Sequence, residues 1–232
     1  MNDLVKKIVG EIAYHFENST FQLYESSYNN YVINGYYLSK ATNIHKNRKI
    51  IVNTLKWFDD FWLYFEIKFS KIELESSLKK EERKSYELKL QESNVKIKDD
   101  YYNINVTLSI FQGDDGDDNK TQLFRAEWDN YDDNQNHPQP HWQINPFKYD
   151  SKTYGDFEEF LGWKEEETFE TSLASGANKN ELIKINKFHF AMSGQWAENR
   201  SHIHKINNES ILLNWLNGML GHIKEQLKFI KS

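Results

Sequence analysis

Cysteine is absent from this chain of 232 residues, and proline and glycine are scarce, with 3 and 10 copies. The lack of cysteine excludes disulfides, thiolate nucleophiles, iron–sulfur clusters and cysteine-ligated zinc. Disordered chains are poor in large rings, whereas 15% of these residues are aromatic. The composition therefore predicts a folded chain whose core is built from Phe, Tyr and Trp.

Long apolar runs are also missing. A membrane-spanning helix needs about 20 apolar residues in succession, but the most apolar run, 61–69, already contains Glu66 and Lys68. The amino terminus carries charges and lacks the apolar centre of a secretory signal. We therefore expect no membrane partner and a cytoplasmic location.

Arginine is the rare cation of the chain. Only 4 of the 29 Lys and Arg residues are Arg, and the 35 Asp and Glu residues leave a net charge of −6. This balance gives no electrostatic reason to predict nucleic-acid binding, although a local basic groove is compatible with it. In a background dominated by Lys, an Arg indicates a need for planar, two-pronged hydrogen bonding.

Amphipathic helices are predicted at both ends of the chain. Apolar residues recur every four positions from Leu4 to Phe16, which places them on one helical face. A second helix is expected from about Glu209, with Asn208 as its N-cap. Its apolar stripe consists of Leu212, Leu216, Met219, Ile223, Leu227 and Ile230.

Alternation of apolar and polar residues predicts strands between these helices. A strand over 61–69 is expected to turn one face to the core and the other, with Trp62, Tyr64, Glu66 and Lys68, partly to water. The fold class predicted is α+β, an antiparallel β-meander sheet covered by the amphipathic amino- and carboxy-terminal helices. The clearest alternation predicts three consecutive antiparallel strands, over 101–111, 121–130 and 141–145.

Residues 71–98 are dense in charges of both signs. Such a pattern is typical of a solvated helix or a long hairpin arm, and a partner-binding projection is the alternative. No internal repeat or linker rich in proline and glycine divides the chain. We therefore expect a single α+β domain over 1–232, with a charged arm at about 71–98.

Residues 124–146 contain all three prolines, two of the eight histidines, two of the seven tryptophans and one of the four arginines. Because alternate residues of a strand share a face, a carboxylate, a guanidinium and an imidazole are expected together on the polar side of the sheet. The candidate catalytic residues are Arg125, Glu127 and His141, and the candidate binding residues are Asp129, His137, Gln143 and Trp142.

Two registers of the returning strand satisfy this pattern. The first sets Glu127 opposite His141 and Arg125 opposite Gln143. The second, shifted by two residues, sets Arg125 opposite His141 and Asp129 opposite His137.

The histidines of the second half also allow a divalent metal. His202 and His204 would lie about 6.6 Å apart on one side of a strand, close enough to converge on one ion. His189 could join them through the sheet. The alternative is that these histidines are scattered over the surface, and His45 is assigned a structural position.

Two functions follow as hypotheses. The first is an intracellular recognition or accessory protein that binds a partner protein or a small ligand through the polar sheet face. The alternative is a hydrolase, metal-dependent or acid–base, that uses the His and carboxylate residues on a substrate such as a phosphodiester. The sequence has no nucleophile elbow, P-loop or dinucleotide-binding motif, so it does not decide whether the protein is an enzyme.

Overall fold

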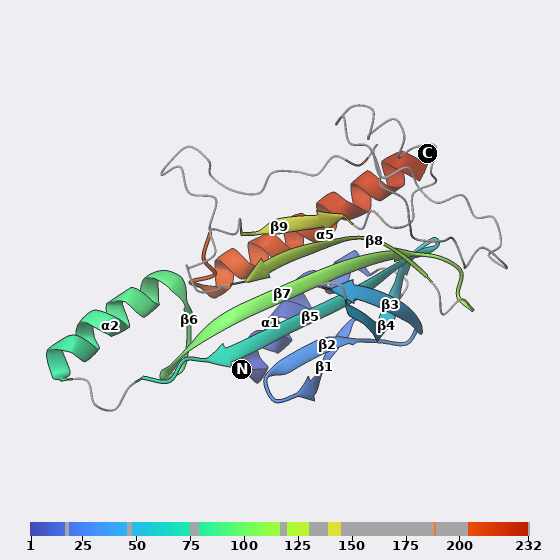
Figure 1. Cartoon of the computed structure of the whole chain (residues 1–232). Helices are drawn as coiled ribbons and strands as arrows, with labels where there is room; N and C mark the ends of the chain where they lie inside the picture. The colour runs from blue at the N-terminus through green and yellow to red at the C-terminus, as the bar shows by residue number, and fades with distance from the viewer. Residues whose placement is uncertain are drawn as a thin grey trace, which may run out of the picture.

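The described strands of the protein form one antiparallel sheet, with a helix at each end of the chain (Figure 1). This arrangement confirms the α+β fold class. The computed structural model describes residues 1–16, 19–45, 48–74, 79–116, 120–129, 139–144, 188 and 204–231.

The described elements follow one another as helix, five strands, helix, four strands and helix. The helices are α1 (Asn2–Ile12), followed by a 3₁₀ turn (Ala13–His15), α2 (Lys80–Ser93) and α5 (Glu209–Lys231). The strands are β1 (Gln22–Ser27), β2 (Asn30–Asn34), β3 (Leu38–His45), β4 (Arg48–Phe58), β5 (Phe61–Lys71), β6 (Val95–Ile97), β7 (Asp100–Gln112), β8 (Thr121–Asp129) and β9 (His141–Ile144).

The strands pair in the order β1-β2-β5-β7-β8-β9, and β6 pairs with the start of β7. The predicted run of three consecutive antiparallel strands is confirmed as β7, β8 and β9. Strand β4 pairs with the first residues of β5 and then leaves the sheet together with β3. Apart from that end of β4, the β3–β4 ribbon pairs with no other described strand of the sheet.

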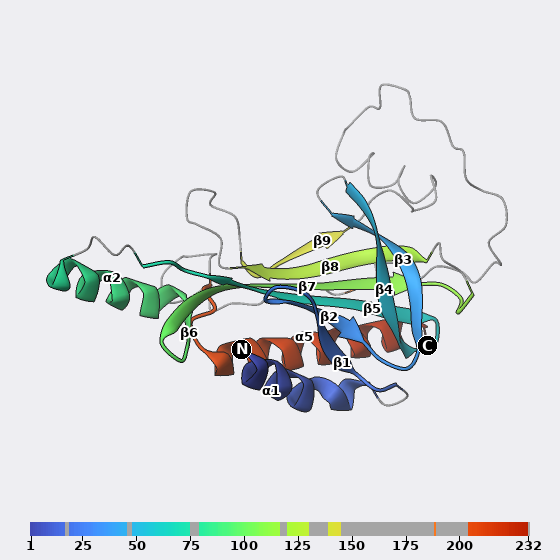
Figure 2. The same ribbon diagram turned by 90° about the horizontal axis from the view of Figure 1, so that it is seen from below.

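Helices α1 and α5 cover one face of the sheet (Figure 2). Both predicted amphipathic helices are confirmed, and the Asn208 side chain accepts a hydrogen bond from the Ile211 N–H at 2.9 Å. An ion pair between Lys7 and Glu209, 3.0 Å long, joins the two helices. The apolar side chains that they bury include Leu4, Val5, Ile8 and Ile12 of α1 and Leu212, Leu213, Leu216, Met219, Leu220, Ile223 and Leu227 of α5.

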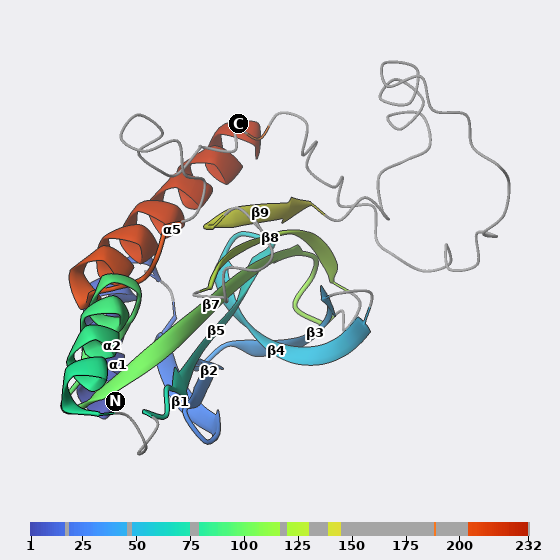
Figure 3. The same cartoon turned by 60° about the vertical axis from the view of Figure 1, so that its left-hand side comes forward.

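The other face of the sheet is covered in part by the β3–β4 ribbon, which curves toward β8 (Figure 3). The face of β5 that was expected to lie partly in water does so at Glu66 and Lys68, whereas Trp62 and Tyr64 are buried, with exposed fractions of 2% and 8%. The ammonium group of Lys120 lies 4.4 Å from the Trp62 ring and donates a hydrogen bond to the Ser39 hydroxyl of β3. The ribbon thus closes over this end of β5.

The charged segment contains helix α2, which extends beyond the end of the sheet (Figures 1 and 2). Most of its side chains are exposed, and Leu90 is its buried residue. Arg83 and Glu87 form an ion pair along its surface at 3.2 Å. Among the described helices, none combines the length and the apolar character that crossing a bilayer requires.

Candidate functional site

A cluster of polar side chains lies on the sheet face opposite the two terminal helices. Arg125 and Glu127 alternate along β8, and β9 sets Gln143 opposite Arg125 and His141 opposite Glu127. The strands therefore adopt the first of the two predicted registers. We call Arg125, Glu127, His141 and Gln143 the polar cluster.

Arg125 stands at the centre of the polar cluster and is only 2% exposed. Its two terminal nitrogens donate to the Ile44 carbonyl of β3 at 2.7 Å, to Glu127 Oε2 at 3.1 Å and to the Gln143 side-chain oxygen. Burial lowers the pKa of Arg125, and the neighbouring charge of Glu127 opposes that change. The planar guanidinium joins three strands, which a lysine ammonium could not do with the same geometry.

Glu127 is the acceptor on which the cluster converges. Burial alone would raise the pKa of its carboxyl, but the hydrogen bond with His141 and the positive charge of Arg125 outweigh it and leave the pKa lowered. Thr107 of β7 donates to Oε1 at 3.4 Å, and His141 Nε2 lies 3.3 Å from Oε2. At neutral pH the side chain is therefore a buried carboxylate.

A second group of hydrogen bonds fixes β3 above the cluster. The Asn43 amide oxygen accepts from Ser109 at 3.1 Å and from Gln122 at 2.9 Å. The Gln122 side chain in turn accepts the Ile44 N–H at 2.7 Å. Side chains of β7 and β8 thus take the place of a neighbouring strand along this edge of β3.

His45, at the end of β3, belongs to the site although the sequence assigned it a structural position. Its Nε2 lies 3.9 Å from Glu127 Oε1, and its side chain is 38% exposed. Alternation along β3 already groups it with Asn43 on one face. The residues that this face meets are decided by the path of the ribbon, so the sequence carried no signal for the contact.

The solvent edge of the site consists of His45, His141 and Gln143. Gln143 is exposed, and its amide nitrogen lies 3.3 Å from His141 Nε2. His141 has a side chain 13% exposed, and its second ring nitrogen, Nδ1, is buried. We call His45, His141 and Gln143 the polar mouth, because they surround the Glu127 carboxylate at the surface.

The other predicted binding residues lie apart from this mouth. Asp129 accepts from Asn105 at 3.3 Å, one position further along the polar face of β8. Trp142 lies on the opposite face of β9, where its ring packs against Phe124 at 5.6 Å and Phe188 at 6.0 Å. His137 lies outside the described residues.

Of the three predicted metal ligands, the structure describes His204. His204 uses its backbone, since its N–H donates to the Gln139 carbonyl and its carbonyl accepts from Trp128. His189 and His202 lie outside the described residues. Within those residues, no group of three or more His, Asp or Glu side chains could hold a metal ion. At the polar cluster, the guanidinium beside Glu127 would repel a cation.

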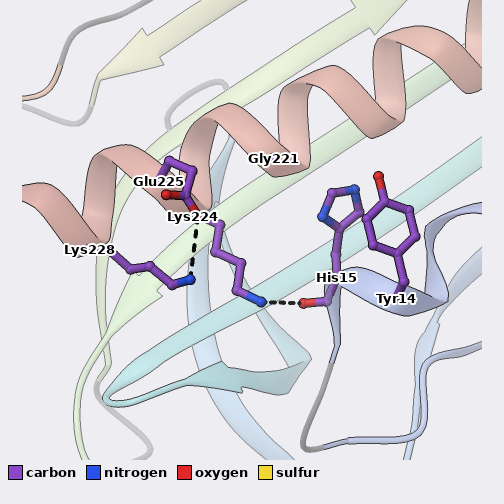
Figure 4. Close-up of a pocket in the computed structure, with 6 residues that line it drawn as sticks. All are labelled: Tyr14, His15, Gly221, Lys224, Glu225 and Lys228. Carbon is purple, nitrogen blue, oxygen red and sulfur yellow. Dashed lines mark hydrogen bonds and ion pairs between the residues drawn. The ribbon is translucent and has the colours of Figure 1, made fainter.

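A separate pocket of about 290 Å³ lies where the chain leaves α1 and passes α5 (Figure 4). The Lys224 ammonium donates to the His15 carbonyl at 3.3 Å, and the same carbonyl accepts from the Trp57 indole at 3.0 Å. Burial, together with the charge of Lys224, lowers the pKa of His15. These contacts join α1, β4 and α5, so we interpret this pocket as a packing junction. Its lining consists of Tyr14, His15, Gly221, Lys224, Glu225 and Lys228.

No protein-family model matches this chain, and no match was found among the curated proteins or the solved structures compared with it. The function is therefore inferred from the geometry of the polar cluster and its mouth.

Proposed function

We propose that this protein is a recognition protein that binds a partner at the polar mouth. The observation that carries the proposal is the convergence of side chains from β3, β8 and β9 on one buried carboxylate, with His45 and Gln143 at the solvent edge. Arg125 already balances the charge of Glu127. The mouth therefore suits a neutral or anionic partner group that exchanges hydrogen bonds with imidazole and amide side chains.

The energetics of the cluster support a role beyond stability. A buried ion pair is a weak source of stability, because removing both charges from water offsets much of their attraction. Arg125 Nε is buried and has no hydrogen-bond partner among the described residues, so the pair is not fully satisfied. A buried site optimised only for stability would be expected to contain apolar residues at these positions.

The geometry of His141 favours binding over proton transfer. A general acid or base must present a ring nitrogen to its substrate. In His141 one ring nitrogen faces Glu127 and Gln143, and the other is buried. The acid–base hydrolase is kept as a second candidate because His45 combines partial exposure with proximity to Glu127.

Site-specific photo-crosslinking tests the proposal. A photoreactive amino acid that replaces Gln143 should give discrete crosslinked products in cells, and the same amino acid at the exposed Leu88 of α2 should not. The partner identified in this way should bind the purified His45→Ala variant more weakly than the wild type, at an unchanged melting temperature. Identical products from both positions, or equal affinities of both proteins, would contradict the proposal.

The hydrolase candidate has its own measurement. Purified protein should hydrolyse an activated phosphodiester such as bis(p-nitrophenyl) phosphate, and the His45→Ala variant should lose that activity. If the two proteins hydrolyse it at the same rate, the second candidate is excluded.

A further inference from the structure

Positive charge is concentrated in one segment of this acidic chain. Residues 26–58 contain no Asp or Glu and five basic residues, so they carry a formal charge of +5 within a chain of net charge −6. The remainder of the chain then carries −11. The five basic residues are Lys40, Lys46, Arg48, Lys49 and Lys56.

Most of this charge belongs to the β3–β4 ribbon. Ala41 and Asn43 of β3 are buried against the sheet, so the alternate residues of β3 point outward. The register pairs Thr42 with Ile51 and Ile44 with Lys49, which places Ile51 and Lys49 on the same outward side. We call this side the ribbon face, and it consists of Leu38, Lys40, Lys49 and Ile51.

Three cations of the ribbon form no ion pair within the described structure. Lys40, Arg48 and Lys49 are exposed and form no ion pair with a described residue. Lys56, at the root of the ribbon, differs because it pairs with Asp115 at 2.6 Å. Among the described residues, no carboxylate forms an ion pair with Lys40 or Lys49 of the ribbon face.

Apolar side chains are exposed beside these cations. Ile51 and Leu38 of the ribbon face are 72% and 38% exposed, and Tyr36 and Tyr37 lie in water just before β3. Single exposed apolar residues are ordinary, but several gathered on one element indicate an interaction surface. Tyrosine is among the residue types that are enriched at protein interfaces.

We propose that the ribbon face docks an acidic protein partner, whose surface has an apolar centre flanked by carboxylates. A nucleic-acid backbone would pair with the cations but would leave Ile51 and Leu38 in water, so a protein partner fits better. This surface does not depend on the proposed function. Its side chains point away from the polar mouth, and it would act as a docking surface whether or not the mouth binds a ligand.

Binding of defined probes to the purified full chain tests this proposal. The probes are a fluorescent peptide rich in Glu and Leu, a single-stranded oligothymidylate of similar charge, and vesicles that contain phosphatidylglycerol. The peptide should bind most tightly at low salt, and its affinity should fall as salt rises. The double reversal Lys40→Glu/Lys49→Glu should weaken peptide binding about tenfold, and Ile51→Ser should weaken it further when added.

A matched control is available on helix α2. Lys80→Glu/Lys84→Glu and Leu88→Ser change exposed residues of the same types and should leave peptide affinity within about twofold of the wild type. All of these variants should keep the wild-type melting temperature, because every changed side chain is exposed.

Several results would overturn the proposal. One is a peptide affinity that the ribbon reversal does not change, or that the α2 control changes equally. Tighter, reversal-sensitive binding of oligothymidylate or vesicles would assign the surface to another class of partner. Dimerisation in sedimentation experiments that Ile51→Ser abolishes would assign it to a second copy of this chain. Crosslinking at Gln143 is scored separately, so failure of the ribbon proposal is distinguishable from failure of the mouth.

Discussion

The two faces of the sheet are held together by different physical forces. On one face, apolar side chains of β5, β7 and β8 pack against α1 and α5, and residues such as Leu108 and Ile110 are fully buried. On the other face, Arg125 and Glu127 are nearly as buried. Arg125 donates hydrogen bonds to β3 and β9, and Glu127 is held by Arg125, by Thr107 of β7 and by His141 of β9. The first face is stabilised by the apolar area that it removes from water. The second is stabilised by hydrogen bonds, which require a particular direction between donor and acceptor.

This difference predicts how each face responds to damage. Apolar packing tolerates exchanges of similar volume, because burial is not directional. A buried ionic network does not tolerate the loss of one partner, because the remaining charge is left without compensation. The two faces can therefore be compared by removing the main support of each.

The largest expected effect is the loss of α5. Seven apolar residues of this helix are buried, and each would cost about 1.5–3 kcal/mol if exposed to water. Their sum, about 10–21 kcal/mol, is as large as or larger than the roughly 5–15 kcal/mol that typically stabilises a whole domain. A chain that ends at Asn208 should therefore give no cooperative melting transition.

A shorter truncation serves as the control. Removal of 229–232 deletes the exposed Phe229, the partly buried Ile230 and the pairs of Lys231 with the exposed Asp59 and the largely buried Asp60. The melting temperature should fall, but the transition should remain cooperative. If the chain that ends at Asn208 melts like the full chain, α5 is peripheral and the description of the apolar face is wrong.

The next effect is expected at the centre of the polar face. Arg125→Ala leaves the Glu127 carboxylate buried without its guanidinium and should lower the free energy of unfolding by about 3–5 kcal/mol in urea denaturation. Arg83→Ala is the matched control, because its ion pair with Glu87 is exposed and should contribute less than about 1 kcal/mol. Equal effects of the two substitutions would show that the polar network does not stabilise the fold.

A smaller effect is expected from acid. The pKa of Glu127 in the folded protein lies below its ordinary value of 4.5, so the folded state binds the proton more weakly than the unfolded chain. The resulting stabilisation is complete above pH 4.5 and is lost as the pH falls through the folded-state pKa. The difference in unfolding free energy between the wild type and Glu127→Gln should therefore shrink in acid.

Denaturation curves at several pH values check this prediction. Glu87→Gln on α2, compared with the wild type in the same series, reports the effect of an exposed carboxylate. A wild-type to Glu127→Gln difference that stays constant through the acid range would contradict the assigned network around Glu127.

Much of the apolar face was predictable from the sequence. The four-residue repeat of α1, the stripe of α5 and the alternation of β7 each report local periodicity, which depends on residues close together in the chain. The pairing of β8 with β9 was narrowed to two registers for the same reason. The structure selected the one that sets Glu127 opposite His141.

The polar face was predictable only in part. The sequence placed Arg125, Glu127, His141 and Gln143 on one side of the sheet, but it did not predict that β3 would cover them. The burial of Trp62 and the contribution of His45 were missed for one reason. Both depend on a ribbon that leaves the sheet and returns over it, a contact between segments about 80 residues apart.

By itself, the sequence determined which residues share a face, because the strand and helix periods are properties of the local backbone. The tertiary structure alone decided which distant segment of the chain each face contacts. Burial drives apolar faces together without specifying a partner, whereas the position of β3 follows from hydrogen bonds that Arg125, Gln122 and Asn43 make across the sheet. Those bonds can form only after the strands have paired, so the polar mouth is a product of the folded chain.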